Sequence, residues 1–293
     1  MDLDPTMPVR GHRSPPTSGW AWLVETVCRL LTELSLVVFP MRCVACEAAD
    51  ASLCQDCARH LRQADREPWQ ASHGAPALQE LNGEPLLPVI AAARYGAVVS
   101  AVLLGFKQQG RTVLARQLAP ALARAVEVAV QELCLPPDHA CPAPVLVPIP
   151  TTGAAFRRRG YDPVALILAE PAIRHLGLDA VRLLRPRWRP AWARHSQKLL
   201  GRAARGRNAR GSLAVRSHQI PRLRGRPIVL IDDVLTTGAT LAEAHRVLSA
   251  TGCEVLGGAV VAAVSGAVSA GGAAWEPDIP KTQENPSRDL RDS

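Results

Sequence analysis

The sequence predicts an α/β fold in which helices cover both faces of a parallel sheet. Segments 145–149, 228–231 and 255–264 have the apolar composition and the length of buried strands. Segments with helical periodicity alternate with them, as at 112–133 and 240–250. Continuous apolar strands separated by helices indicate a sheet that is buried on both sides, and such sheets are built from parallel strands.

The other elements follow from local patterns. Val89–Ala93 is the first expected strand of this region. The helix expected at Pro163–Leu176 begins with a proline, which suits a first turn because that position needs no N–H donor. The helix at 240–250 is expected to stop before Gly252. The helix at 112–133 places apolar side chains on one face at four-residue steps, namely Leu114, Leu118, Leu122 and Val126.

Composition divides the chain into five regions. Residues 1–19 are rich in Pro, Ser and Gly and are expected to form a disordered leader. Residues 20–63 should hold an amphipathic helix and a cysteine cluster, and 64–88, rich in Pro, Gly, Gln and Glu, should be a linker. The α/β domain is expected at 89–265 and a disordered tail at 266–293.

The apolar segment 20–39 is expected to be a helix that packs on the protein's own core. Glu25, Arg29 and Glu33 interrupt it, whereas a membrane span carries few or no charges. The first twenty residues lack the apolar run of a secretory signal. These observations predict a cytoplasmic protein without membrane insertion, and they leave the oligomeric state open.

Positive charge is concentrated in one part of the chain. Residues 180–231 hold thirteen Arg and one Lys and contain no Asp or Glu. The net charge of the whole chain is +8, so this block contributes +14 and the remainder sums to about −6. A basic block on an otherwise acidic chain suggests that a polyanion binds there. The alternative is a solvated basic face, to which most of these cations would belong.

Four cysteines have the spacing of a metal site. Cys43, Cys46, Cys54 and Cys57 form two CxxC pairs within fifteen residues, and two such pairs can surround a tetrahedral Zn²⁺. Disulfides are disfavoured without secretion, and paired CxxC spacing argues against unligated core cysteines. Four thiolates close the coordination shell, so the predicted Zn²⁺ is structural, and a ribbon this short would need it to fold.

An apolar strand followed by a Thr- and Gly-rich loop and a helix predicts a phosphate site at 228–240. Ligands of parallel α/β sheets bind at the carboxyl ends of strands. The start of the next helix offers free N–H groups and a positive dipole to a phosphate. Gly238 would let the backbone approach that phosphate closely. The candidate binding residues are Thr236, Thr237, Gly238, Ala239 and Thr240.

The acidic pair Asp232 and Asp233 specifies the ligand further. Carboxylates would repel a phosphate, so they are expected to accept hydrogen bonds from the hydroxyls of a ribose. Ribose hydroxyls at one end and a 5-phosphate at the other define a phosphoribosyl group. The alternative is a strand that ends in solvated Asp residues before an ordinary helix. The full segment 228–240 resembles the 5-phosphoribosyl-1-pyrophosphate (PRPP) motif of type I phosphoribosyltransferases.

Further segments resemble the ComF family, which joins a small zinc ribbon to a phosphoribosyltransferase domain. The likeness covers roughly residues 30–265, and its parts occur in the same order. They are Phe39-Pro40, Tyr95-Gly96, Phe106-Lys107, Val147–Pro150, Arg157–Tyr161, the set Gln197, Leu200, Arg205 and Asn208, and then the PRPP motif.

The resemblance implies a type I phosphoribosyltransferase fold and roles for the cations. The loop after 145–149 corresponds to the pyrophosphate loop, with Arg159 as its candidate contact. The segment 182–210 corresponds to a mobile loop that closes over the pyrophosphate, with Lys198, Arg202 and Arg205 as candidates. Two positions depart from the family pattern and bear on transfer and acceptor choice. Asp162-Pro163 stands where Asn-Gln is common, and Ser196 stands where Asp is common.

If the protein is an enzyme, a nucleophile displaces pyrophosphate at C1 of PRPP, with Mg²⁺ bound to the substrate. Asp232 and Asp233 would be its catalytic residues. The acceptor is not identified by the sequence, although a nucleobase is one option. The alternatives are a PRPP sensor and a factor that handles single-stranded DNA during DNA uptake. Segment 187–194 interleaves Trp with Arg, as single-strand binders do. The alternative, which we favour, is a mobile active-site loop whose tryptophans pack on the part of the protein that covers the acceptor. A zinc ribbon used only for protein interaction has no positive support.

Overall fold

The computed structural model describes residues 41–80, 82–134, 142–187 and 209–264. The predicted leader, the helix at 20–39 and the tail lie outside these residues, as do Lys198, Arg202, Arg205 and the Trp-containing part of segment 187–194. The described part of the chain holds no helix that is both long and apolar enough to cross a membrane.

The predicted α/β class with a parallel sheet is confirmed. The central sheet has the strand order β1-β2-β7-β6-β3. All pairs in it are parallel except β1 with β2, which are antiparallel. The strands are β1 (Trp69–Gln70), β2 (Val89–Arg94), β3 (Val145–Pro148), β6 (Ile228–Leu235) and β7 (Val255–Ala263). A separate antiparallel pair is formed by β4 (Leu184–Pro186) and β5 (Leu213–Val215).

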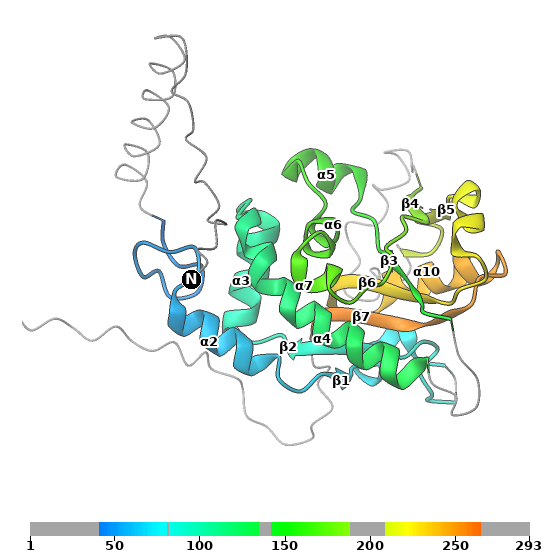
Figure 1. Ribbon diagram of the computed structural model, residues 1–293, viewed down its shortest axis with the longest axis horizontal. Coiled ribbons are helices and arrows are strands. Elements are labelled where there is room, and N and C mark those ends of the chain that lie inside the picture. The colour runs from blue at the N-terminus through cyan, green and yellow to red at the C-terminus, as the bar shows by residue number, and fades with distance from the viewer. Residues whose placement is uncertain (1–40, 81, 135–141, 188–208, 265–293) are drawn as a thin grey trace, which may run out of the picture.

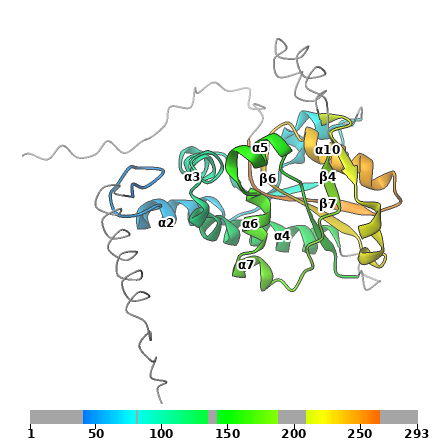
Figure 2. The same cartoon turned by 90° about the horizontal axis from the view of Figure 1, so that it is seen from above.

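Helices cover both faces of the sheet because its strands are apolar on both sides. Val229 and Ile231 of β6 belong to one core cluster, and Ile228 and Leu230 belong to the other. Figure 2 shows α10 on one side of the sheet and α4, α6 and α7 on the other. The helices are α2 (Gln55–Ala64), α3 (Ala97–Gln108), α4 (Ala115–Leu133), α5 (Gly153–Arg159), α6 (Pro163–Leu168), α7 (Pro171–Arg174) and α10 (Ala239–Ser249).

Three local differences from the sequence prediction have physical causes. The helix expected at 163–176 is divided into α6 and α7, because Pro171 cannot continue a helix and instead starts the next one. The helix expected from Thr112 begins with one 3-10 turn, η3 (Thr112–Leu114), before α4. Helix α3 was not predicted, since its Val-rich run with an internal Gly105 does not favour a helix by propensity.

The predicted linker at 64–88 is wrong as a description of that segment. Its strand β1 pairs with β2, and its 3-10 turns η1 (Ser72–Gly74) and η2 (Pro76–Leu78) pack on the α10 side of the sheet. Leu78 and Leu87 are fully buried. The composition of the segment indicated a linker because Pro, Gly and Gln are common in loops. Here these residues form tight turns, and a few leucines pack against the sheet. The segment is a folded cap on the sheet.

Candidate functional site at the carboxyl edge of the sheet

The parallel strands bring their carboxyl ends to one edge of the sheet, where the candidate residues lie. Strand β6 runs through the acidic pair to Leu235, because Asp232 stays in register with Val260 of β7. The sequence had ended this strand at Ile231. Successive side chains of a strand point to opposite faces, so Asp232 and Asp233 have different neighbours.

Asp233 is buried and forms an ion pair with a residue that sequence analysis gave no role. Its Oδ1 lies 2.7 Å from Nζ of Lys107, which is the last cation of α3. The side chains of Asp233 and Lys107 are 10% and 24% exposed. A partly buried ion pair of this kind holds the carboxylate in a fixed position beside the ammonium group. The sequence did not predict this ion pair, because 126 residues separate Lys107 from Asp233. Lys107 appeared there only as part of Phe106-Lys107 in the resemblance to the ComF family.

Asp232 lies beside this pair and is held differently. Its Oδ1 accepts a hydrogen bond from the backbone N–H of Asp233 at 2.8 Å. Desolvation and the neighbouring Asp233 carboxylate raise the pKa of Asp232 well above its usual range, whereas that hydrogen bond and Lys107 act in the opposite direction. The two adjacent carboxyl groups are therefore electrostatically unequal.

The loop 236–238 joins the acidic strand to α10 and is covered by the folded cap. Thr236 and Thr240 are exposed, and Gly238 is buried at the start of the helix with φ +77°. The carbonyl of Thr237 accepts a hydrogen bond at 2.9 Å from the N–H of Ala77 in η2. These contacts hold the predicted phosphate loop beside the acidic pair.

The structure requires glycine at position 238 for a reason other than the close approach of a phosphate that the sequence predicted. A Cβ at this position would lie 2.5 Å from Cγ of Leu78 and 3.1 Å from Cβ of Ala75. Its positive φ is also a conformation that favours glycine. Glycine is therefore required by the turn and by the cap that packs on it, before any phosphate is considered.

Arg159 lies at the end of α5, across from the end of α3. Its Nε is buried, and the described residues offer it no hydrogen-bond partner. The nearby Tyr161 hydroxyl donates to the carbonyl of Phe106, and the two rings lie 5.9 Å apart between centroids. Burial raises the pKa of Tyr161, against the effect of Arg159. Tyr161 thereby ties the end of α5 to α3.

The four predicted metal ligands converge. The sulfur atoms of Cys43, Cys46, Cys54 and Cys57 lie within 4.8 Å of one another, so the cluster can hold a metal ion. Two backbone N–H groups point at sulfurs, from Cys54 to Cys43 at 3.4 Å and from Cys57 to Cys54 at 3.5 Å. Against desolvation, such donors lower the pKa of Cys43 to about 6, which favours its thiolate form.

The cysteine cluster is packed against the helix that carries Lys107. A Cβ on Gly105 of α3 would lie 2.8 Å from Cγ1 of Val44, so helix and cluster are in close contact. Arg111, just beyond α3, donates to the carbonyl of Arg42. Figure 1 shows the cluster segment beside α3 at the end of the domain. The sequence predicted the metal ligands but not this support for α3.

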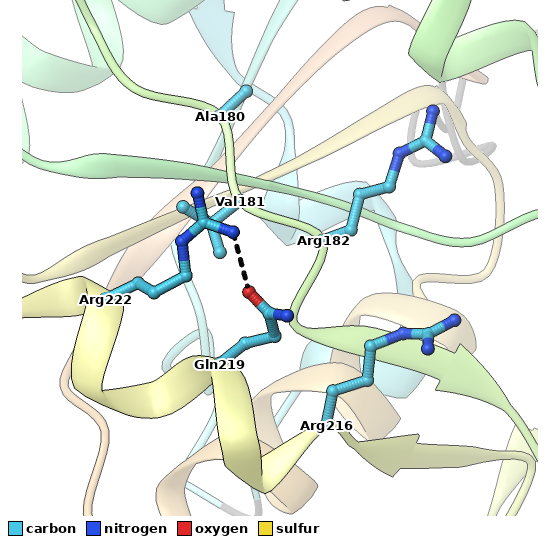
Figure 3. Close-up of a pocket in the computed structure, with 6 residues that line it drawn as sticks. All are labelled: Ala180, Val181, Arg182, Arg216, Gln219 and Arg222. Atoms are coloured by element: carbon cyan, nitrogen blue, oxygen red, sulfur yellow. Dashed lines mark hydrogen bonds between the residues drawn. The ribbon is translucent and has the colours of Figure 1, made fainter.

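A basic surface lies at the amino ends of the parallel strands, opposite the carboxyl edge that holds the acidic pair. Two adjoining pockets of about 410 and 360 Å³ share Ala180, Val181 and Arg222. Figure 3 shows the first of these pockets, where the guanidinium of Arg222 donates a hydrogen bond to Oε1 of Gln219. Together the pockets are lined by five arginines, Arg182, Arg216, Arg222, Arg224 and Arg226, and we call this surface the arginine groove.

The arginine groove is distant from the acidic pair. Arg226 precedes β6 by two residues, and its guanidinium donates to the carbonyls of Ala143 and Pro144 just before β3. Asp232 lies six residues further along the chain, about 20 Å at roughly 3.3 Å per strand residue. The carboxylate lining the groove, Asp179, is paired with Arg226. The basic block therefore does not converge as a whole on the carboxyl edge.

Comparison with known proteins agrees with this geometry. The phosphoribosyl transferase domain family matches residues 165–281, a range that includes β6, the loop and α10. Competence protein F of Haemophilus influenzae is 26% identical over 229 residues, which cover 74% of this chain and 94% of that protein.

Shorter similarities involve enzymes of known type. Adenine phosphoribosyltransferases of Mycobacterium marinum and Mycobacterium avium are 59% and 64% identical over 39 residues. The chain spans only 21% and 22% of the length of these two proteins. Together with the cysteine cluster, the comparisons confirm the expected resemblance to the ComF family and to phosphoribosyltransferase domains.

Proposed function

We propose that this chain, a ComF-type protein with a phosphoribosyltransferase domain, binds Mg²⁺·PRPP at the carboxyl edge of its sheet and transfers the phosphoribosyl group to an acceptor. The observation that carries the proposal is the position of the acidic pair. Asp233, paired with Lys107, stands near the carboxyl end of the strand that leads into loop 236–238 and α10.

The ligand would be held at both ends of its ribose. Its 2- and 3-hydroxyls would donate to the carboxylates of Asp232 and Asp233. Its 5-phosphate would lie at the first turn of α10, where N–H groups have no partner within the helix and where Thr236 and Thr240 are exposed. Magnesium bound to the substrate would neutralise part of the pyrophosphate charge.

Transfer would form one bond and break another at C1 of the ribose. A nitrogen of the acceptor would bond to C1 as the bond from C1 to the pyrophosphate oxygen breaks. Pyrophosphate would leave with the electron pair, and the acceptor nitrogen would lose its proton to solvent. The protein's contribution is to position the two molecules and to stabilise charge, and no covalent enzyme intermediate is required.

Isothermal titration with Mg²⁺ and PRPP tests the binding step, and pyrophosphate release on addition of nucleobases tests the transfer step. We expect binding at a 1:1 ratio that is lost in Asp232→Ala/Asp233→Ala. Binding without release by any acceptor would favour a PRPP sensor. A folded double variant that binds PRPP as well as the parent would refute the site.

A second candidate function is binding of single-stranded DNA, and the arginine groove favours it. Five arginines line the groove, and its carboxylate, Asp179, is already paired. Phosphate contacts from such cations give binding that weakens steeply with salt. The test is fluorescence anisotropy with labelled single-stranded DNA over a salt series. Arg182→Gln/Arg216→Gln should weaken the complex, and unchanged binding would argue against the groove.

We also infer that the cysteine cluster holds a structural Zn²⁺. Four thiolates are a donor set that zinc prefers, and they leave no position open for substrate. Close packing of the cluster on α3 gives the metal a role in holding that helix, and thereby Lys107, in place.

A further inference from the structure

A pocket at the carboxyl edge of the sheet lies apart from the phosphate loop. It has a volume of about 640 Å³ and lies between the end of α3 and the end of α5. This volume is in the range of sites that bind small molecules. The pocket is lined by Lys107 and the following turn on one side and by Arg158, Arg159 and Tyr161 on the other.

The lining of the pocket is cationic. The described residues that form it include three cations and no carboxylate. Asp233 balances the charge of Lys107, so the guanidinium groups of Arg158 and Arg159 remain as excess positive charge. The buried Nε of Arg159 has no partner among the described residues. A buried donor without a partner is costly, and a bound anion would satisfy it.

The pocket is built before any ligand arrives. The hydrogen bond from Tyr161 to the Phe106 carbonyl and the contact between their rings hold its two walls together. After Lys107, a hydrogen bond from the Arg111 guanidinium to the carbonyl of Arg42 holds the turn that follows α3 against the segment of the cysteine cluster. Walls fixed in this way can position a small ligand with little loss of conformational entropy.

The location of the pocket matches the acceptor better than the pyrophosphate. Lys107 lines the pocket and also contacts Asp233, so the pocket adjoins the expected ribose position. The expected pyrophosphate loop begins directly after β3, at residues 149–152, and the sequence analysis had included Arg159 in it. Helix α5 separates that loop from Arg159 by seven residues, about 10 Å at roughly 1.5 Å per residue.

We propose that this pocket receives the acceptor, and that the acceptor is a small molecule with a carboxylate or phosphate group. The anionic group binds Arg158 and Arg159, and the nucleophilic nitrogen faces the ribose beside Lys107. This inference rests on the proposed function and assigns it a class of acceptor, in place of a neutral nucleobase. It also assigns Arg159 to the acceptor, where sequence analysis had assigned it to pyrophosphate.

Matched pairs of anionic and neutral compounds test the proposal by calorimetry, with and without saturating Mg²⁺·PRPP. Orotate with uracil and nicotinate with nicotinamide test a carboxylate, and phenyl phosphate with phenol tests a phosphate. We expect at least one anion to bind about ten- to a hundredfold more tightly than its neutral partner, as a charge-assisted hydrogen bond would give. Arg158→Gln/Arg159→Gln should remove that difference.

Arg157→Gln is the control, because Arg157 is exposed on the same helix and is not among the lining residues. It should leave the anion preference unchanged. The proposal is overturned if no anion is preferred, if the double variant keeps the preference, or if that variant loses PRPP affinity instead. Failure of the parent protein to bind PRPP refutes the proposed function and the acceptor role together. Anion binding that still depends on Arg159 would then identify the pocket only as an anion site.

Discussion

Nζ of Lys107, at the end of α3, lies 2.7 Å from Oδ1 of Asp233 in β6. The pair joins the helix supported by the cysteine cluster to the acidic edge of the sheet. It therefore places a cation between two sites, the proposed ribose contact at Asp233 and the pocket beside Arg159. The local charge on this edge is set by a contact between distant parts of the chain.

A double-mutant cycle should measure this pair directly. Lys107→Met and Asp233→Asn should show a coupling of about 0.5–3 kcal/mol in the free energy of unfolding, measured with urea. Both side chains are mostly buried, so solvent screens the pair poorly. The exposed pair of Arg59 with Asp56 is the control and should couple by less than about 0.5 kcal/mol. Equal coupling energies in the two cycles would contradict the claim that burial strengthens the pair of Lys107 with Asp233.

Asp233→Ala should weaken PRPP binding about ten- to a hundredfold while the protein stays folded. A hydrogen bond from a hydroxyl to a charged acceptor contributes roughly 1.5–3 kcal/mol. The fold should survive because the apolar residues Ile228–Ile231 hold β6 in both core clusters. Calorimetry gives the affinity, and circular dichroism checks the fold. Unchanged affinity in a folded variant would remove Asp233 from the site.

PRPP affinity should rise as the pH rises through the pKa of Asp232. That pKa is raised in the free protein, so Asp232 keeps its proton to a higher pH than an ordinary Asp. A ribose hydroxyl donates best to the carboxylate, so binding should release a proton. Calorimetry in buffers of different ionisation enthalpy measures that release. Asp232→Asn should abolish it, and an unchanged release in this variant would assign the proton to another group.

Gly238→Ala should destabilise the fold more than Gly252→Ala. Both glycines have a φ near +78°, which costs about 1–2 kcal/mol for an alanine. At Gly252 the added Cβ meets no heavy atom within 4 Å, whereas at Gly238 it meets Leu78. Urea unfolding of the two variants separates backbone strain from the clash with the cap. Equal losses of stability would show that Leu78 moves aside without cost.

Purified protein should contain about one Zn²⁺ per chain, and Cys46→Ser should reduce that content sharply. Loss of the metal should also increase hydrogen exchange in α3, because Val44 and Arg42 contact that helix and the turn after it. Cys253→Ser is the control, since Cys253 lies outside the cluster. Protein purified without chelator that contains no zinc would refute the assignment.

The sequence by itself determined the elements whose evidence is local. The apolar strands, the CxxC pairs and the Thr- and Gly-rich loop after the acidic pair are each recognisable within about fifteen residues. Their periodicity and spacing follow from the geometry of a strand, a helix or a tetrahedral metal, so the fold class and four converging sulfurs could be predicted. The residues assigned to PRPP remain predictions.

The tertiary structure decided which distant residues meet. Lys107 reaches Asp233, and Leu78 covers Gly238, although long stretches of sequence separate each pair. Neither contact leaves a local pattern, because each depends on how a helix or a cap packs against the sheet. The predicted linker at 64–88 failed for the same reason, since a few buried leucines determine its fold. Packing, which is a property of the whole chain, gives the site its charge and shape.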